Sequence, residues 1–164
     1  MKRRAPGASA VASRPPLERV EMAIANRTGE LARVAARLDE LAARVGLPGG
    51  AVADMQVALD EVLTNVLSHA YDDTASHEIL VALAVYPDAL EATVEDDGRP
   101  FDPLTIAPPD RGAPLAARKV GGLGIHFVRS LMSEVAYRRV GERNRLVLTR
   151  ALAADPGHGD DRAA

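Results

Sequence analysis

The spacing of apolar side chains along the chain predicts five strands. In the first and third, apolar and polar residues alternate, which is typical of a strand with one buried face. The second is an almost unbroken apolar run and favours a central strand covered on both faces, or nearly so. The last two are joined by the turn 141–144 and form a hairpin. The predicted strands are residues 19–24, 78–86, 89–95, 135–140 and 145–152.

Apolar residues at helical spacing predict three helices between these strands. The first helix follows a cap at Asn26 or Thr28 and ends at Gly46. The second covers about residues 51–71, and the third follows the glycines at 121–124. The order of these elements predicts an α+β domain of two layers, with the helices on one face of a mixed, mainly antiparallel sheet.

The composition fits one globular domain. The chain has 164 residues, of which 47% are apolar and 26% charged. Aromatic residues make up only 3%, so the core is expected to consist of Leu, Val, Ala and Ile. A net charge of −3 argues against a nucleic-acid-binding protein that neutralises phosphates. The absence of cysteine excludes disulfides, thiolate zinc sites and a cysteine nucleophile.

Three segments lack the pattern of regular elements. Residues 1–16 and the polar residues 153–164 are predicted to be disordered tails around a globular domain of residues 17–152. The first tail has basic residues but no apolar core of a signal peptide, and no run has transmembrane length. The sequence therefore predicts a cytoplasmic protein that does not bind membranes. Residues 104–120, rich in proline, predict a long loop that acts as a lid.

The predicted second helix carries a column of polar residues. Glu61, Asn65 and His69 follow one another at four-residue spacing and therefore share one helix face. The oxygen atoms of Glu61 and Asn65 suit Mg²⁺, and the Glu61 carboxylate can orient or deprotonate an attacking hydroxyl. The alternative is an exposed polar face without a ligand, with His69 in a structural role.

An acidic loop follows the third strand. Asp96 offers a carboxylate that can accept a hydrogen bond from an exocyclic amine such as that of adenine, and Gly98 would let the base approach the backbone. Asp97 is expected to face solvent. The alternative is an Asp-Gly turn that merely reverses the chain.

A glycine cluster, Gly121-Gly122-Leu123-Gly124, precedes the third helix. Free N–H groups at a helix start bind phosphate along the helix dipole, and glycines let the backbone come close. The cluster lacks the Gly-Lys-Ser/Thr ending of a P-loop, and no strand leads directly into it as in a dinucleotide fingerprint. A plain turn is the alternative.

Together, these three motifs resemble those of the GHKL ATPase superfamily, whose members have the Bergerat ATP-binding fold. Residues 59–71 are similar to its N box, residues 96–103 to its G1 box and residues 121–125 to its G2 box. The motifs occur in the same order, and the likeness covers about residues 17–152.

Within the superfamily, the chain is most similar to the bacterial anti-sigma-factor serine/threonine kinases. The Pro-Phe-Asp-Pro ending at 100–103 and the final hairpin with Tyr137 and Asn144-Arg145-Leu146 match that subgroup. Ser133 departs from it, because the subgroup often has an acidic residue there.

The resemblance implies a role for each motif. Glu61 would be the base or an orienting carboxylate, and Asn65 would bind Mg²⁺. Asp96 would bind the adenine amino group, with Gly98 beside the base. The ATP phosphates would be contacted by the glycine cluster and by one cation of the lid: Gly121, Gly122, Leu123 and Gly124, with Lys119 or Arg118.

The resemblance also implies an activity, cofactors and partners. With ATP and Mg²⁺, the protein would phosphorylate a serine or threonine of an antagonist protein, and it would sequester a sigma factor. The resemblance also suggests that it forms a homodimer. One alternative is a nucleotide-gated regulator of the same fold that binds a partner without phosphorylating it. Another is the catalytic half of a histidine kinase, for which no upstream helical hairpin with a phospho-accepting His is visible. Arg33 and Arg37 offer either a docking surface or a solvated face.

Overall fold

The computed structural model describes residues 14–106 and 123–153. Five strands form one sheet in the order β1-β2-β3-β5-β4, and every neighbouring pair is antiparallel. β5 runs between β3 and β4, because the chain passes to the sheet edge as β4 and returns through a hairpin. The strands are β1 (Glu18–Ala25), β2 (Glu78–Tyr86), β3 (Ala89–Asp96), β4 (Glu134–Val140) and β5 (Arg143–Ala151).

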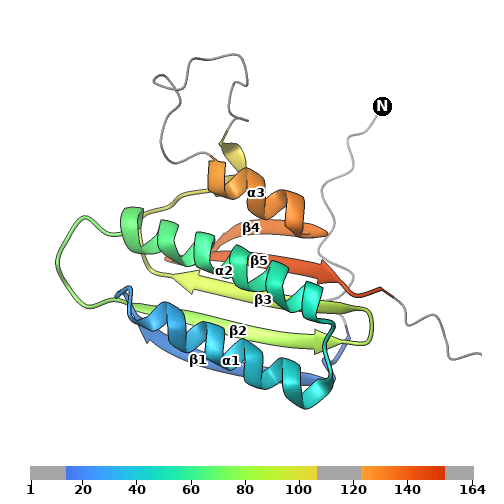
Figure 1. The fold of residues 1–164 in the computed structure, drawn as a ribbon. Coiled ribbons are helices and arrows are strands. Elements are labelled where there is room, and N and C mark those ends of the chain that lie inside the picture. Colours follow the sequence, from blue (N-terminus) through green and yellow to red (C-terminus); the bar gives the residue numbers. More distant parts are fainter. Residues whose placement is uncertain (1–13, 107–122, 154–164) are drawn as a thin grey trace, which may run out of the picture.

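Three helices cover one face of this sheet: α1 (Glu30–Val45), α2 (Gly49–His69) and α3 (Leu123–Leu131) (Figure 1). The helices and the sheet enclose a core of Leu, Val, Ile, Ala and Met side chains, as the low aromatic content predicts. Leu38 of α1, Leu63 of α2 and Leu90 of β3 are fully buried in it. The predicted α+β fold with two layers is therefore confirmed.

The other face of the sheet, which we call the open face, carries no α-helix in the described part of the chain. Leu80 of β2 lies on it and is 36% exposed, whereas its neighbours Ile79 and Val81 are buried under the helices. The prediction that β2 is covered on both faces is therefore wrong for the first half of the strand. An apolar run does not reveal which face a helix covers. Towards the strand's end, Ala84, Tyr86 and Ala89 form a small second cluster.

The start of α1 differs from the prediction. Gly29 precedes the helix and no side chain caps it, so neither Asn26 nor Thr28 has the predicted role. Asn26 instead binds the segment before β2: its Oδ1 accepts from the His77 N–H (3.0 Å) and its Nδ2 donates to the Ala75 carbonyl (3.1 Å). The polar side chain thus fixes a connection 51 residues away in sequence.

Two glycines end elements where the backbone needs a left-handed conformation. Gly46 has a φ of 71° and closes α1, as predicted. Gly141 has a φ of 58° in the hairpin turn, which consists of Gly141 and Glu142 alone. The hairpin turn is therefore shorter than the four residues predicted. As a result Asn144 belongs to β5, and its side chain enters the space beneath the helices.

Several predictions fall partly or wholly outside the described residues. They concern most of the tails at 1–16 and 153–164 and most of the lid at 104–120. The lid's described start contains the short helix η2 (Pro103–Thr105), where the Asp102 carboxylate accepts from the Leu104 N–H (2.9 Å). In the described part of the chain, we find no helix that is long and apolar enough to cross a membrane.

Candidate functional site

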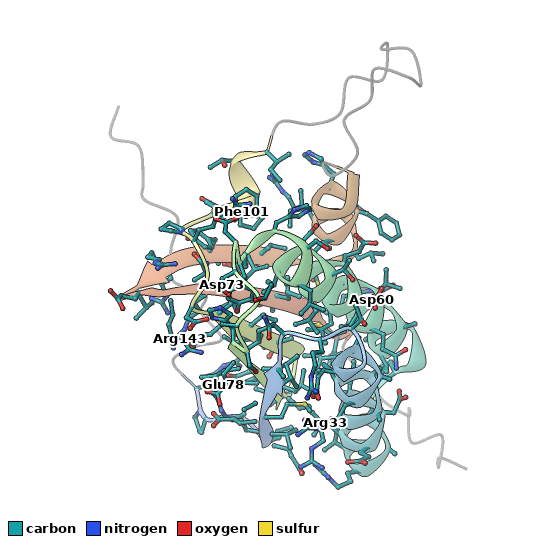
Figure 2. The ribbon with its side chains drawn as sticks, turned by 90° about the vertical axis from the view of Figure 1, so that its left-hand side faces the viewer. Arg33, Asp60, Asp73, Glu78, Phe101 and Arg143 are labelled. Atoms are coloured by element: carbon teal, nitrogen blue, oxygen red, sulfur yellow. The ribbon has the colours of Figure 1, made fainter. Side chains whose placement is uncertain are left out.

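A pocket opens between the C-terminal half of α2, the end of β3 and the first turns of α3. Asn65, Asp96 and Asn144 provide its main polar groups, while Val62, Ile125 and other aliphatic side chains form its walls. Phe101 lines its rim and is 47% exposed. Figure 2 shows Phe101 at the end of the molecule where η2 and α3 lie, away from Arg33. An apolar pocket with few convergent polar groups is typical of a small-molecule site.

Asp96 is the last residue of β3 and is only 5% exposed. Its Oδ1 accepts two hydrogen bonds of 2.9 Å each, from the Gly98 N–H and from Asn144 Nδ2. The bond to Gly98 is that of an Asp-Gly turn, so this alternative describes the local backbone correctly. The same carboxylate also lines the pocket, which a turn alone does not require. Asp96 is thus a buried acceptor available to a ligand.

Gly98 is needed because the loop packs tightly on the end of α2. A Cβ atom there would lie 2.6 Å from both the Cβ and the carbonyl oxygen of Ala70. The Arg99 N–H donates to that same carbonyl (3.0 Å). This contact is a reason for glycine that differs from the predicted approach of a base, and it joins the α2 motif to the acidic loop.

Glu61 lies against the first turn of α3. A Cβ atom on Gly124 would meet the Glu61 carboxylate, so any larger residue there would displace this carboxylate from the start of α3. Asn65 is one helical turn further along α2 and lines the pocket with Asp96, as does His69, which is exposed. The structure therefore brings Glu61 to Gly124, and Asn65 to Asp96.

The remaining predicted phosphate contacts cannot be placed. Lys119, Gly121 and Gly122, together with Arg118, lie outside the described residues. Leu123 begins α3, so the glycine cluster leads into a helix as predicted. The roles of all these residues remain predictions.

Three residues of the β4–β5 hairpin belong to the site but were assigned no role from the sequence. Asn144 accepts from the Tyr137 hydroxyl (2.8 Å) and from Arg139 Nη1 (2.9 Å), and it donates to Asp96. The sequence pattern of β5 could have indicated the role of Asn144. Asn144, Leu146 and Leu148 alternate along the strand, and their side chains face the helices. A polar residue in the first position of that row is unexpected unless it has partners.

A second polar cluster lies behind the acidic loop. His77 contacts Asp73 through Nε2 (2.9 Å) and Asp97 through Nδ1 (3.3 Å), and its ring stacks on Tyr71 with centroids 4.0 Å apart. The hydrogen bond with Asp73 raises the pKa of His77 and lowers that of Asp73. Burial, followed by the charges of Asp96 and Asp97, raises the pKa of Tyr71.

Asp97 faces solvent as predicted, with 43% of its side chain exposed, although it also pairs with His77. No partner for His77 was predicted, but the i, i+4 spacing of Asp73 and His77 was a visible signal.

The residues present fit an adenine nucleotide. Asp96 is a buried acceptor for an amine, and aliphatic side chains such as Val62 and Ile125 line the same pocket beside it. For Mg²⁺, Asn65 offers one oxygen, and the described residues hold no group of three His, Cys, Asp or Glu that could bind a metal. This is consistent with an ion that takes its other ligands from phosphates and water.

Residues 24–150 match the family of the histidine kinase-like ATPase domain. Because this match covers most of the chain, the chain belongs to the histidine kinase-like ATPase domain family. The family is the one that the three motifs indicate, since the GHKL superfamily includes the ATP-binding domains of histidine kinases.

Curated proteins similar to this chain include several named serine-protein kinase RsbW. The protein from Listeria monocytogenes serovar 1/2a is 35% identical over 102 residues, which are 60% of this chain and 65% of that protein. The protein from Bacillus cereus is 30% identical over 122 residues, which are 72% of this chain and 76% of that protein. The chain thus spans about two thirds of the length of the Listeria relative.

A solved structure has the same fold. The crystal structure of the RsbU and RsbW domains of Rv1364c from Mycobacterium tuberculosis matches with a TM-score of 0.61 and 22% identity. The match covers 84% of this chain and 32% of the other. It agrees with the two-layer α+β architecture described above.

Proposed function

We propose that this chain is an ATP-dependent serine/threonine protein kinase of the anti-sigma-factor type, which phosphorylates an antagonist protein and sequesters a sigma factor. One observation carries the proposal: Asn65 and Asp96 line one pocket, while Glu61 lies against the first turn of α3. These positions support the roles that the resemblance implies for the three motifs. The names of the curated relatives, serine-protein kinases, support the transfer chemistry.

Asp96 and Asn65 would hold the two ends of the nucleotide. The Asp96 carboxylate would accept a hydrogen bond from the adenine amino group, within walls formed by Val62 and Ile125. Mg²⁺, held by Asn65 with phosphate oxygens and water, would neutralise phosphate charge. The free N–H groups at the start of α3, near Gly124, would face the phosphates.

Glu61 would act on the protein substrate. As the serine or threonine oxygen forms a bond to the γ-phosphorus, Glu61 accepts the hydroxyl proton and the bond between this phosphorus and the ADP oxygen breaks. ADP leaves with the electron pair of that bond. The contact of Glu61 with Gly124 supports this role, since it places a carboxylate at the helix start where the phosphates would lie.

A second candidate function is a nucleotide-gated binding module that does not phosphorylate its partner. One observation favours it: Glu61, which also borders the groove between α1 and α2, is not among the residues that line the pocket of Asn65 and Asp96. A nucleotide can therefore be bound without Glu61 acting as a base. In either case we expect a cytoplasmic protein that works as a homodimer and binds a sigma factor and its antagonist, but neither nucleic acid nor membrane.

Labelling with γ-phosphate-tagged ATP and Mg²⁺ tests the two functions. Partners are first captured from the native cell in the presence of ATP or ADP, and the antagonist is then incubated with the purified protein. The kinase predicts a labelled serine or threonine, no transfer by Glu61→Ala and no nucleotide binding by Asn65→Ala. Asp60→Asn is a matched control, because Asp60 is the exposed neighbour of Glu61 on α2 (Figure 2).

Two results would contradict the kinase. Nucleotide-dependent capture of a partner without any label supports the binding module. Full transfer by both Glu61→Ala and Asn65→Ala shows that the assigned site is wrong.

A further inference from the structure

Asn144 is the most connected side chain of the site. It lies on β5 directly opposite Asp96 on β3, and it is 6% exposed. Its Nδ2 donates to Asp96 Oδ1 and to the Arg99 carbonyl, each at 2.9 Å, and lies 3.5 Å from the Gly98 carbonyl. Its Oδ1 accepts from Tyr137, Arg139 and the Phe101 N–H at 2.8, 2.9 and 3.4 Å. One buried amide thus holds both the carboxylate and the loop after it.

The orientation of this amide is fixed by its partners. All the groups near Nδ2 are acceptors: the Asp96 carboxylate and two carbonyls. All the groups near Oδ1 are donors: the Tyr137 hydroxyl, the Arg139 guanidinium and the Phe101 N–H. A flipped amide would face donor with donor and acceptor with acceptor, so only one orientation satisfies the network.

The fixed amide also fixes the two oxygens of Asp96 in different roles. Oδ1 accepts from Asn144 and from the Gly98 N–H, and no hydrogen bond from a described residue reaches Oδ2. Two donors on Oδ1 hold the carboxylate in one orientation. Oδ2 is the atom left for a ligand in the pocket.

We propose that Asn144 is a positioning residue that determines base specificity: it holds the Asp96 carboxylate in one orientation as an acceptor, so that the pocket prefers adenine to guanine. Adenine offers an amine donor at the position where guanine has a carbonyl oxygen, and a carbonyl facing Oδ2 would leave two acceptors together. Asn144 is not a ligand contact in this proposal but acts through Asp96. The inference rests on the proposed function only in that the pocket binds an adenine nucleotide.

Asn144→Asp tests the proposal sharply. The substitution keeps the shape and the acceptor oxygen facing Tyr137 and Arg139, but it replaces the donor beside Asp96 by a second carboxyl oxygen. Two carboxyl groups this close share one proton, and only the protonated form of residue 144 can donate to Asp96. We therefore expect ATP affinity about tenfold below wild type at about pH 8, with recovery towards wild type at about pH 5. The ratio of ATP to GTP affinity should follow the same curve.

Three further variants make the result interpretable. Tyr137→Phe removes one donor to Asn144 and should lower the ATP affinity only a few-fold, without the new pH dependence. Asn144→Leu removes every hydrogen bond of the amide and should lose the preference for ATP at all pH values. Arg145→Gln is the control: it breaks the close ion pair with Glu95 one residue away, on the open face, and should leave both affinities unchanged.

Calorimetric titration of ATP and GTP across this pH range gives the affinities, and hydrogen exchange of the Phe101 N–H in the free protein shows whether the loop is held. The proposal is overturned if Asn144→Asp has the wild-type ATP to GTP ratio at every pH. It is also overturned if the variant loses both nucleotides equally without pH dependence, because Asn144 would then only support the loop. In both cases wild-type ATP binding leaves the proposed function standing. If wild type binds no nucleotide, the proposed function is wrong and this inference with it.

Discussion

Two pairs of buried polar residues lie across the same two strands, β3 and β5, but on opposite faces of the sheet. Asp96 pairs with Asn144 beneath the helices, and Glu91 pairs with Thr149 on the open face. All four residues are between 5% and 7% exposed. In the first pair the hydrogen bonds form a closed network, whereas Glu91 Oε2 and Thr149 Oγ1 have no partner in the described part of the chain.

The two pairs are equally buried but differ in their hydrogen bonding. Burying a polar group costs stability unless it is hydrogen-bonded, so equal burial does not mean equal cost. The satisfied pair holds a carboxylate in one orientation at a pocket, which a ligand requires. The pair on the open face is expected to lower stability, because Glu91 Oε2 and Thr149 Oγ1 are buried without a partner among the described residues. The following predictions test this contrast.

Asp96→Asn should have the largest effect. It replaces the acceptor at the pocket by an amide and removes a charge-assisted hydrogen bond, so ATP affinity should fall by about a hundredfold. Calorimetric titration measures the loss. Glu91→Gln, on the open face, and Asp97→Asn, which is exposed, are controls that should retain wild-type affinity. An equal loss in Asp96→Asn and Glu91→Gln would remove the distinction between the two pairs.

Gly98→Ala should have the next largest effect. The added Cβ would meet the Cβ and the carbonyl of Ala70 at 2.6 Å, and the backbone carbonyl cannot move aside easily. We expect the free energy of unfolding to fall by about 1–3 kcal/mol, measured by urea denaturation. Gly50→Ala is the matched control, because nothing lies within 4 Å of its Cβ position in α2. There the helix should gain about 0.5–1 kcal/mol. Unchanged stability in Gly98→Ala would show that the loop is not packed on α2.

Thr149→Val should have a smaller effect of the opposite sign. The valine keeps the shape of threonine and removes a buried hydroxyl that lacks a partner, so the free energy of unfolding should rise by about 0.5–1 kcal/mol. The same measurement on Tyr137→Phe should show a loss, since that hydroxyl is bonded to Asn144. A loss of stability in Thr149→Val would show that Thr149 is as well satisfied as the polar groups under the helices.

Glu91 adds a pH dependence to this contrast. Burial raises its pKa above the usual value of 4.5, so the folded protein binds a proton more readily than the unfolded chain does. Stability should therefore fall as the pH rises from about 4.5 through the raised value. Denaturation curves across this range should show that the free energy of unfolding of the wild type declines with pH. Glu91→Gln should lack the part of this decline that is due to Glu91. Parallel curves for the two proteins would contradict the role of Glu91.

His77→Gln should have the smallest effect. The pKa of His77 is raised mainly by the hydrogen bond with Asp73, so its contribution to stability is fully present below about pH 6.5. The contribution is lost as the pH rises through the raised value. The difference between wild type and His77→Gln in urea denaturation should follow this profile. Asp73→Asn should reproduce it and Asp72→Asn should not, whereas a constant difference at all pH values would refute the pairing.

Much of the fold could be predicted from local patterns. Alternation and helical spacing are properties of short segments, so β2 (Glu78–Tyr86) was predicted with the observed bounds, and α2 within two residues at each end. Which face of β2 the helices leave open depends on how the layers pack, and the exposure of Leu80 was therefore missed. The absence of a side-chain cap at α1 was missed because Asn26 binds a distant segment instead.

The residues of the candidate site also fall into two groups, those that local sequence motifs predict and those that only the tertiary structure reveals. Glu61, Asn65, Asp96 and Gly124 belong to contiguous motifs with a chemical meaning, and they were predicted from the sequence. The role of Asn144 arises from pairing with a strand 48 residues earlier, and the hairpin prediction placed it in the turn. Only the tertiary structure brings its amide to Asp96. A residue that acts by positioning another residue is difficult to recognise from the sequence around it.

The position of β5 between β3 and β4 sets the order in which the site can assemble during synthesis. β3 leaves the ribosome long before β5, and its terminal carboxylate has no partner on that edge until β5 arrives. The pairing of β3 with β5 is a contact of high sequence separation, and such contacts form slowly. The nascent chain up to residue 140 therefore has β3 as an exposed edge, which invites pairing with other chains. Nucleotide binding should accordingly appear only after the last strand has been made, as a late marker of complete folding.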